Sequence, residues 1–200
     1  MKKLDLSKAI KALRNGQIIV YPTDTLYGLG ADIFNDDAVK KIFKIKKRKK
    51  NNPLSVAVAN IKELENIAVV DDKTRCLIRT FLPGKLTIVL KRKSNVSDIV
   101  TGSSDKVAIR IPNNEIALDL LSKFGPLTAT SANIHGKKPP VNINDISIQF
   151  KASDIAVYID NGKLDGKPST IVDMTEKPFK IIRKGTISEK AIMDAISYEQ

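Results

Sequence analysis

The chain has 200 residues, of which 42% are hydrophobic and 28% are charged, and this composition predicts one globular domain spanning residues 1–200. The formal net charge of +12 favours anionic partners, either nucleotides or nucleic acid, although lysine-rich chains are also common as plain surface solvation. The chain has a single cysteine, Cys76, and a single histidine, His135, so it can form neither an internal disulfide nor a zinc site built from Cys and His.

The first elements follow from hydrophobic spacing. Residues 5–14 place apolar side chains at the three- and four-residue spacing of an amphipathic helix, which an Asn-Gly pair ends. The continuous apolar run QIIVY at residues 17–21 predicts a short buried strand, closed by a proline. The hydroxyl-rich stretch PTDTLYGLG at residues 22–30 follows as a loop.

A second helix is expected from Asn35, with acidic residues near its start and lysines near its end, where each sign of charge suits the helix dipole. Five consecutive cations, KKRKK, occupy residues 46–50. Pro53 cannot continue a helix, so we expect the backbone to become extended within residues 46–52.

Further strand-like runs and helical patterns fill the rest of the chain. Some neighbouring strands have no helix between them, which favours an α/β fold with a mixed sheet and flanking helices over an all-parallel sheet. Residues 186–189 fit a capping box at the start of the last helix. Strands are expected at residues 54–58, 86–90, 107–111, 127–130, 155–159, 170–173 and 179–182, and helices at 72–82, 115–124 and from Ser188.

Lys46 and Arg48 are candidates for binding a phosphate group. In an extended segment, residues two apart point the same way, so the two cations could converge on one oxyanion. Arginine also offers a phosphate two parallel hydrogen bonds. A solvated helix end is the alternative interpretation of the same basic run.

A second group of polar residues follows the strand expected at residues 127–130. Ser131 and Asn133 are again two apart and would face a crevice at the end of the strand together. A turn stabilised by local side-chain hydrogen bonds is the alternative. Neither a phosphate-binding P-loop nor a complete dinucleotide-binding glycine motif is present, so a nucleotide would have to be held by other groups.

Arg110 lies among apolar residues in the sequence VAIRIP and therefore requires an anion, from the protein or from a ligand. Ser169 and Arg183 lie at the boundaries of expected strands and are weaker candidates of the same kind.

These segments resemble the YrdC-like family of threonylcarbamoyl-AMP synthases. Seven motifs occur in the family's order between Gly16 and Gly185, namely PTDTLYGLG, IKKR with PLSV, PGKLTIVL, VAIRIP, TSANIHG, STIVD and IIRKG. The resemblance implies a YrdC-like fold, with a twisted mixed sheet, flanking helices and a basic ligand crevice. It also implies the synthesis of threonylcarbamoyl-AMP and pyrophosphate from threonine, bicarbonate and ATP.

The resemblance also implies roles for individual residues, which match the family's motifs by position. Lys46, Arg48, Ser131 and Asn133 are the expected catalytic and ATP-binding set, with Arg183 on the nucleotide. Thr23, Asn52, Arg110, Thr130 and Ser169 are the expected threonine contacts. Asn52 departs from the family pattern, since many members have histidine there, and its amide can form hydrogen bonds but cannot titrate.

The chemistry implied by the resemblance needs positioning and positive charge but no protein nucleophile. Mg²⁺ is expected to arrive with the ATP phosphates and to have no dedicated protein ligands. The expected partner is the complex that transfers the threonylcarbamoyl group to tRNA, while direct tRNA binding is expected to be weak or indirect.

No apolar run approaches the ~20 residues of a membrane span and no signal-peptide pattern opens the chain, so a cytoplasmic protein without a membrane partner is expected. Two other functions remain open. One is an RNA-binding module that uses the basic surface, although the aromatic content of 5% offers few stacking platforms. The other is a carbamoyl-adenylating domain without selectivity for threonine.

Overall fold

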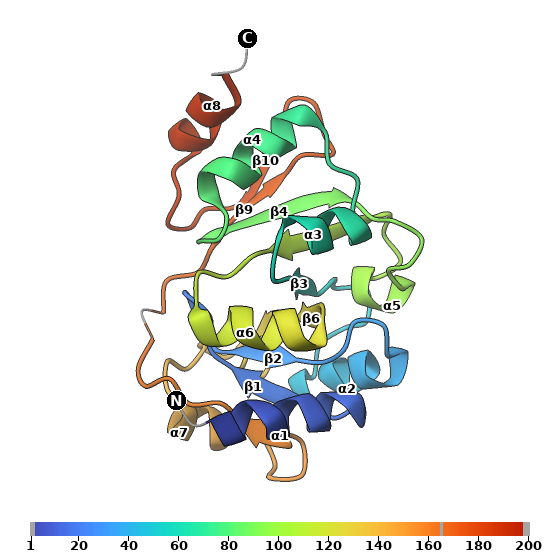
Figure 1. Cartoon of the computed structure of the whole chain (residues 1–200), viewed down its shortest axis with the longest axis vertical. Coiled ribbons are helices and arrows are strands. Elements are labelled where there is room, and N and C mark those ends of the chain that lie inside the picture. The colour runs from blue at the N-terminus through green and yellow to red at the C-terminus, as the bar shows by residue number, and fades with distance from the viewer. Residues whose placement is uncertain (1–2, 165, 198–200) are drawn as a thin grey trace.

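The computed structural model describes residues 3–164 and 166–197 (Figure 1). The strands form two mixed sheets, a four-stranded sheet of order β7-β2-β1-β8 and a six-stranded sheet of order β10-β9-β4-β5-β3-β6. The first helix, α1 (Lys3–Arg14), and the last, α8 (Glu189–Ser197), lie at opposite ends of the long axis (Figure 1). The mixed α/β fold is therefore confirmed, with two sheets where the sequence predicted one.

The smaller sheet is built on β1 (Ile19–Tyr21), which pairs antiparallel with β2 (Gly28–Gly30) and parallel with β8 (Val157–Tyr158). On its other side β2 pairs with β7 (Thr130–Ser131). The glycines of β2 allow a close approach, because a Cβ atom at Gly30 would lie 3.0 Å from the ring of Tyr21.

The larger sheet has the longest strand, β4 (Leu86–Lys91), near its middle, antiparallel to β5 (Lys106–Arg110) and parallel to β9 (Thr170–Asp173). The remaining strands of this sheet are β3 (Ser55–Ala57), β6 (Leu127–Thr128) and β10 (Lys180–Arg183).

Helices α3 (Ile61–Ile67) and α4 (Asp72–Phe81) cover one face of the larger sheet (Figure 1). Their apolar residues join the larger hydrophobic cluster with those of β4 and β9. A second cluster joins α1 and α6 (Glu115–Phe124) to Ile19 and Tyr21. The other helices are α2 (Asp36–Lys46), α5 (Asp98–Thr101) and α7 (Ile143–Ser147).

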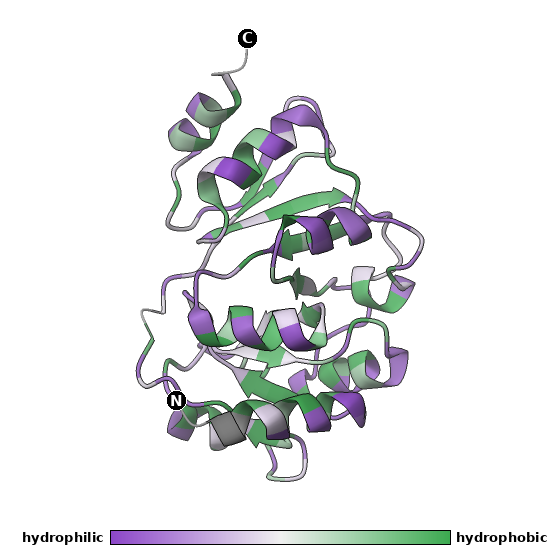
Figure 2. Cartoon of the chain, viewed as in Figure 1, coloured by the Kyte–Doolittle hydropathy of each residue, from purple (hydrophilic) through white to green (hydrophobic). Residues whose placement is uncertain are grey.

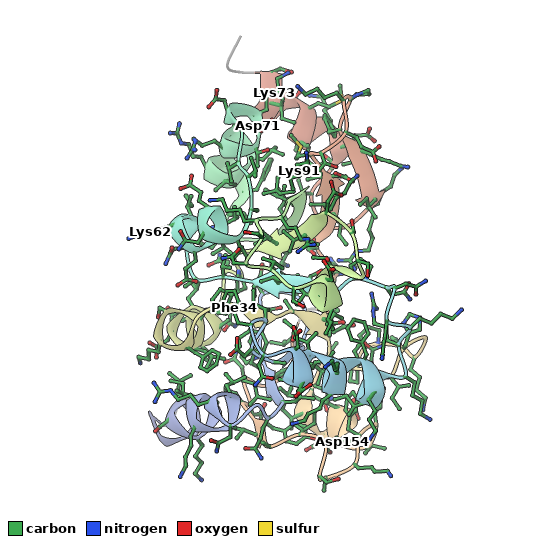
Figure 3. The ribbon with its side chains drawn as sticks, turned by 90° about the vertical axis from the view of Figure 1, so that its right-hand side faces the viewer. Phe34, Lys62, Asp71, Lys73, Lys91 and Asp154 are labelled. Carbon is green, nitrogen blue, oxygen red and sulfur yellow. The ribbon has the colours of Figure 1, made fainter. Side chains whose placement is uncertain are left out.

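The distribution of hydropathy agrees with this arrangement. The strands of the larger sheet are mostly hydrophobic, whereas the helices alternate between hydrophobic and hydrophilic residues (Figure 2). Exposed charges project from the helices, as Lys62 does on α3 (Figure 3). Among the helices of the described residues, none combines the length and the apolar character that crossing a bilayer requires.

Three predictions about strands and the start of the last helix were wrong. The stretch expected to be a loop contains β2, since Gly-Leu-Gly lacks the β-branched residues that mark a strand. The single strand expected at residues 127–130 is two, because the chain passes at Ala129 from the larger sheet to the smaller one. The last helix is capped by the hydroxyl of Ser188, which accepts a hydrogen bond from the Ala191 amide at 3.2 Å, and not by a capping box that starts at residue 186.

Candidate active site

A crevice of about 570 Å³ is lined by residues of both sheets. This volume is within the range of sites for small ligands. Alternation along the strands explains its position: Leu86 and Ile88 are buried in the core, whereas Thr87 and Val89 point to the other face and line the crevice. Strand β3 contributes Ser55, β5 contributes Ala108 and Arg110, and β9 contributes Ile171, with Ser169 directly before it.

The hydroxyl-rich segment between β1 and β2 forms one rim. The hydroxyl oxygen of Thr23 accepts hydrogen bonds from the amides of Thr25 and Leu26, both at 3.2 Å, and donates to the Leu26 carbonyl at 2.7 Å. This compact turn keeps Thr23 buried at the crevice, where the sequence predicted a threonine contact.

Arg110 has a buried anionic partner that the sequence analysis missed. Its Nη2 atom lies 2.5 Å from Oδ1 of Asp24, and the two side chains are only 7% and 8% exposed. Nη1 donates to the hydroxyl of Thr25 at 2.9 Å. Burial lowers the pKa of Arg110, and the charge of Asp24 opposes that shift. The protein therefore supplies the anion that the buried arginine requires, while Arg110 still lines the crevice.

The expected extended segment after α2 is wrong. Lys46 is the last helical residue, and Lys47 ends the helix in the left-handed conformation, with φ 52°. The Arg48 amide then donates to the Phe43 carbonyl at 3.0 Å, which closes the helix end as a compact turn. Lys46 and Arg48 therefore do not project side by side from an extended backbone.

The side chain of Lys46 points into the protein interior and does not line the crevice. It is only 1% exposed, and its Nζ donates to the carbonyl oxygen of Ser131 at 2.5 Å and to that of Asn133 at 2.7 Å. Burial, with a contribution from the charge of Arg48, lowers the pKa of Lys46 to about 7. Lys46 thus holds the segment that carries Ser131.

Arg48 does line the crevice. Its Nε donates to the Asn52 carbonyl at 3.2 Å and its Nη2 to the Pro53 carbonyl at 2.8 Å, and burial lowers its pKa. Only the backbone of Asn52 takes part in these bonds, and its side chain is not among the groups that line the crevice. A threonine contact by Asn52 stays a prediction.

Ser131 and Asn133 have different surroundings. Ser131 lines the crevice and donates its hydroxyl to Oδ1 of Asn133 at 2.6 Å. Asn133 is 6% exposed, lies behind Ser131, and donates from Nδ2 to the carbonyls of Ile134 and Lys137 at 2.9 and 2.6 Å. Asn133 therefore matches the local turn that was the alternative interpretation, whereas Ser131 faces the crevice with the neighbouring Thr130.

Arg183 and Ser169 close the opposite rim. Arg183 donates to the Ser169 carbonyl from Nε at 3.1 Å and to the Ser169 hydroxyl from Nη2 at 3.0 Å. The close approach depends on Gly185, where a Cβ atom would lie 2.4 Å from the backbone of Ser169. Burial lowers the pKa of Arg183, and so does the positive charge of Arg110.

The lining is suited to an anion. Three arginines, Arg48, Arg110 and Arg183, line the crevice, and Asp24 offsets only one of them. Among the described residues, no group of three or more His, Cys, Asp or Glu side chains is placed to hold a metal ion. Guanidinium and hydroxyl groups fit phosphate and carboxylate oxygens instead.

The Sua5/YciO/YrdC family model, described as telomere recombination, matches residues 11–185. The chain belongs to this family. Its membership confirms the resemblance that the seven motifs indicated, and it covers both sheets and every residue of the crevice.

Individual members of the Sua5/YciO/YrdC family are similar over most of the chain. A relative from Methanocaldococcus jannaschii is 42% identical over 178 residues, which are 88% of this chain and 84% of the relative. The threonylcarbamoyl-AMP synthase of Pyrococcus abyssi is 37% identical over 187 residues, which are 92% of this chain and 55% of that protein. The crystal structure of P. abyssi Sua5 complexed with L-threonine superposes with a TM-score of 0.94 at 35% identity, over 98% of this chain and 58% of that one. The chain thus spans just over half the length of its Pyrococcus relative.

Proposed function

We propose that this protein is a threonylcarbamoyl-AMP synthase, which joins threonine, bicarbonate and ATP and releases pyrophosphate. The observation that carries the proposal is a crevice that combines three arginines with a row of hydroxyl groups, in a member of the Sua5/YciO/YrdC family. The P. abyssi relative that bears this name and its complex with L-threonine support the same function.

In the proposed reaction, the amine of threonine and bicarbonate form a carbamate with loss of water. A carbamate oxygen attacks the α-phosphorus of ATP, the bond from that phosphorus to the bridging oxygen breaks, and pyrophosphate leaves with the electron pair. Negative charge builds up on the phosphate oxygens during this step, and fixed cations in a cleft stabilise it. Arg48 and Arg183 line the crevice and are suited to this role.

The other half of the crevice suits an amino acid. Arg110 presents a guanidinium for a carboxylate, and Thr23, Thr130 and Ser169 contribute hydroxyl groups to the same lining. Lys46 and Asn133 act from behind Ser131, since they hold its backbone and side chain and do not line the crevice. In this proposal they are positioning residues.

In our proposal Mg²⁺ enters with ATP, since the described residues that line the crevice include no Asp or Glu and the nucleotide's own phosphate oxygens are good ligands for it. It would neutralise part of the triphosphate charge. We further propose that the protein acts in the cytoplasm and that its product passes to the complex that modifies tRNA.

The test is to measure pyrophosphate release and adenylate formation with each substrate omitted in turn. We expect both products only when threonine, bicarbonate and ATP are all present. Equal turnover with serine or glycine would favour an adenylating domain without threonine selectivity. Absence of turnover together with tight tRNA binding would favour the RNA-binding module.

A further inference from the structure

Thr87 lies on β4 and lines the crevice, but none of the roles described above involves it. It is 2% exposed, and its hydroxyl oxygen lies 2.8 Å from that of Ser169. The register that pairs Ile88 with Ile109 places Thr87 opposite Arg110, and on its other side Thr87 pairs with Ile171. Thr87 therefore lies between the arginine suited to a carboxylate and the hydroxyl of Ser169.

Within residues 3–164 and 166–197, the hydrogen bonds of the Thr87 and Ser169 hydroxyls leave one of the two hydroxyl protons without an acceptor. Nη2 of Arg183 donates to the Ser169 oxygen at 3.0 Å, and a guanidinium can only donate. The bond between Thr87 and Ser169 uses one of their two hydroxyl protons. Within the part of the chain that the structure describes, neither hydroxyl has another acceptor, so one proton remains for a ligand.

The charge of Arg183 favours hydrogen bonds that run from Arg183 to Ser169 and from Ser169 to Thr87, and this direction leaves the free proton on Thr87. A hydrogen bond from the positively charged Arg183 polarises the Ser169 hydroxyl and makes it a better donor to Thr87. The hydroxyl of Thr87 is then polarised in the same sense. Its proton is available to an acceptor oxygen in the crevice.

The surroundings of Thr87 indicate which oxygen this is. Val89 follows Thr87 on the same face of β4 and pairs with Ala108 of β5, and both side chains line the crevice. Ile171 adds a third apolar group beside Thr87. A hydroxyl donor next to an apolar floor fits a substrate carbon that carries one hydroxyl and one methyl group, as Cβ of threonine does.

We propose that Thr87 is a specificity-determining residue, which donates a hydrogen bond to the side-chain hydroxyl of the amino-acid substrate while Val89 and Ala108 contact its methyl group. This inference rests on the proposed function and refines it. Arg183 and Ser169 orient Thr87 in addition to any contact of their own with substrate. Discrimination against an amino acid without the hydroxyl then depends on Thr87.

The experiment compares Thr87→Val, which keeps the shape but removes the hydroxyl, with Thr87→Ser, which keeps the hydroxyl. L-threonine affinity is measured by calorimetry, and kcat/KM for pyrophosphate release is measured with L-threonine, L-serine and the isosteric L-valine. We expect Thr87→Val to weaken threonine binding by roughly 10-fold or more and to reduce the preference for threonine over valine. Thr87→Ser should restore most of that preference.

Thr101→Val is a matched control, because Thr101 in α5 is also buried but is not among the residues that line the crevice. It should leave threonine affinity at the wild-type value. If Thr87→Val keeps the wild-type preference while Ser169→Ala loses it, the donor is Ser169 and the inference is overturned. If the wild-type protein neither binds threonine nor releases pyrophosphate, the proposed function itself fails, and that result is distinct.

Discussion

The Nζ of Lys46 lies 2.7 Å from the backbone carbonyl of Asn133, although 87 residues separate the two along the chain. A second bond between the same segments runs from the His135 amide to the Lys46 carbonyl at 2.8 Å. The end of α2 and the loop after β7 therefore form one unit. Any movement of Lys46 displaces Ser131, which faces the crevice.

Lys46 should make stability depend on pH. Its pKa is about 7 in the folded protein, below the ordinary value of 10.5 for an exposed lysine. Between these values the unfolded chain binds more protons, so the free energy of unfolding should rise with pH, by at most about 1.4 kcal/mol per pH unit. Lys46→Met should lack this rise. Urea unfolding of both proteins at pH 7, 8 and 9 checks the prediction, and parallel pH profiles would contradict it.

Arg48→Ala should impair the reaction with the fold intact. A charge-assisted hydrogen bond contributes roughly 1.5–3 kcal/mol, which corresponds to about 10- to 150-fold in kcat/KM for ATP. Arg48→Lys should recover only part of this loss, because an ammonium lacks the planar fork. Steady-state kinetics and a thermal melt of each variant provide the measurement. Near-normal rates for Arg48→Ala would show that Arg48 lines the crevice without stabilising the reacting phosphates.

Asp24→Asn should destabilise the protein strongly, because it leaves the guanidinium of Arg110 buried without a counter-charge. Breaking a buried ion pair from one side typically costs about 3–5 kcal/mol. Replacing both partners, as in Asp24→Asn with Arg110→Met, should cost much less than the sum of the two single changes. Urea unfolding of the four proteins gives the coupling energy. Additive effects would show that the pair contributes no specific interaction.

Gly185→Ala should displace the end of β10. The new Cβ atom would lie 2.4 Å from backbone atoms of Ser169 and Thr170, neither of which can yield without moving a strand. Gly28→Ala is the comparison, since its Cβ would meet the edge of the Tyr21 ring at 3.2 Å. We expect the larger fall in melting temperature for Gly185→Ala, with weaker binding of ATP and threonine. Equal melting temperatures for the two variants would argue against a steric origin.

The affinities for RNA and for ATP should respond differently to salt concentration. RNA held through six or more phosphate contacts should lose roughly 10³-fold in affinity between 50 and 200 mM salt. ATP in the crevice meets fewer charges, in a partly buried setting, and its affinity should fall far less. Titration of tRNA and ATP at both salt concentrations measures the difference. Salt-tolerant, tight tRNA binding with feeble ATP binding would reverse the order.

Local signals in the sequence predicted most elements of the fold. Helix α2 follows from Asn35, whose side chain caps it, and from the lysines of its last turn. The helix end could not be predicted in the same way. Lys47 adopts a left-handed conformation that glycine usually signals, so Pro53 suggested an extended segment that the Lys46 contacts override.

In the site, too, local motifs could be predicted from the sequence and long-range contacts could not. Motif order identified the segments, and seven candidates line the crevice, while their contacts with ligands stay predictions: Thr23, Arg48, Arg110, Thr130, Ser131, Ser169 and Arg183. Asp24 and Thr87 were missed, because their partners, Arg110 and Ser169, lie 86 and 82 residues away along the chain. Periodicity along one segment carries no information about such long-range neighbours. Three other candidates, Lys46, Asn52 and Asn133, do not line the crevice, and their roles stay predictions.

The alternation along β4 constrains how such a site can evolve. Thr87 and Val89 face the crevice while Leu86 and Ile88 face the core, so a point substitution can alter ligand preference and leave the core intact. An insertion or deletion of one residue in the strand would exchange the two faces, placing leucine in the crevice and threonine in the core. Divergence in substrate preference within this sheet should therefore proceed by residue replacement at fixed strand length, with length variation confined to the connecting loops.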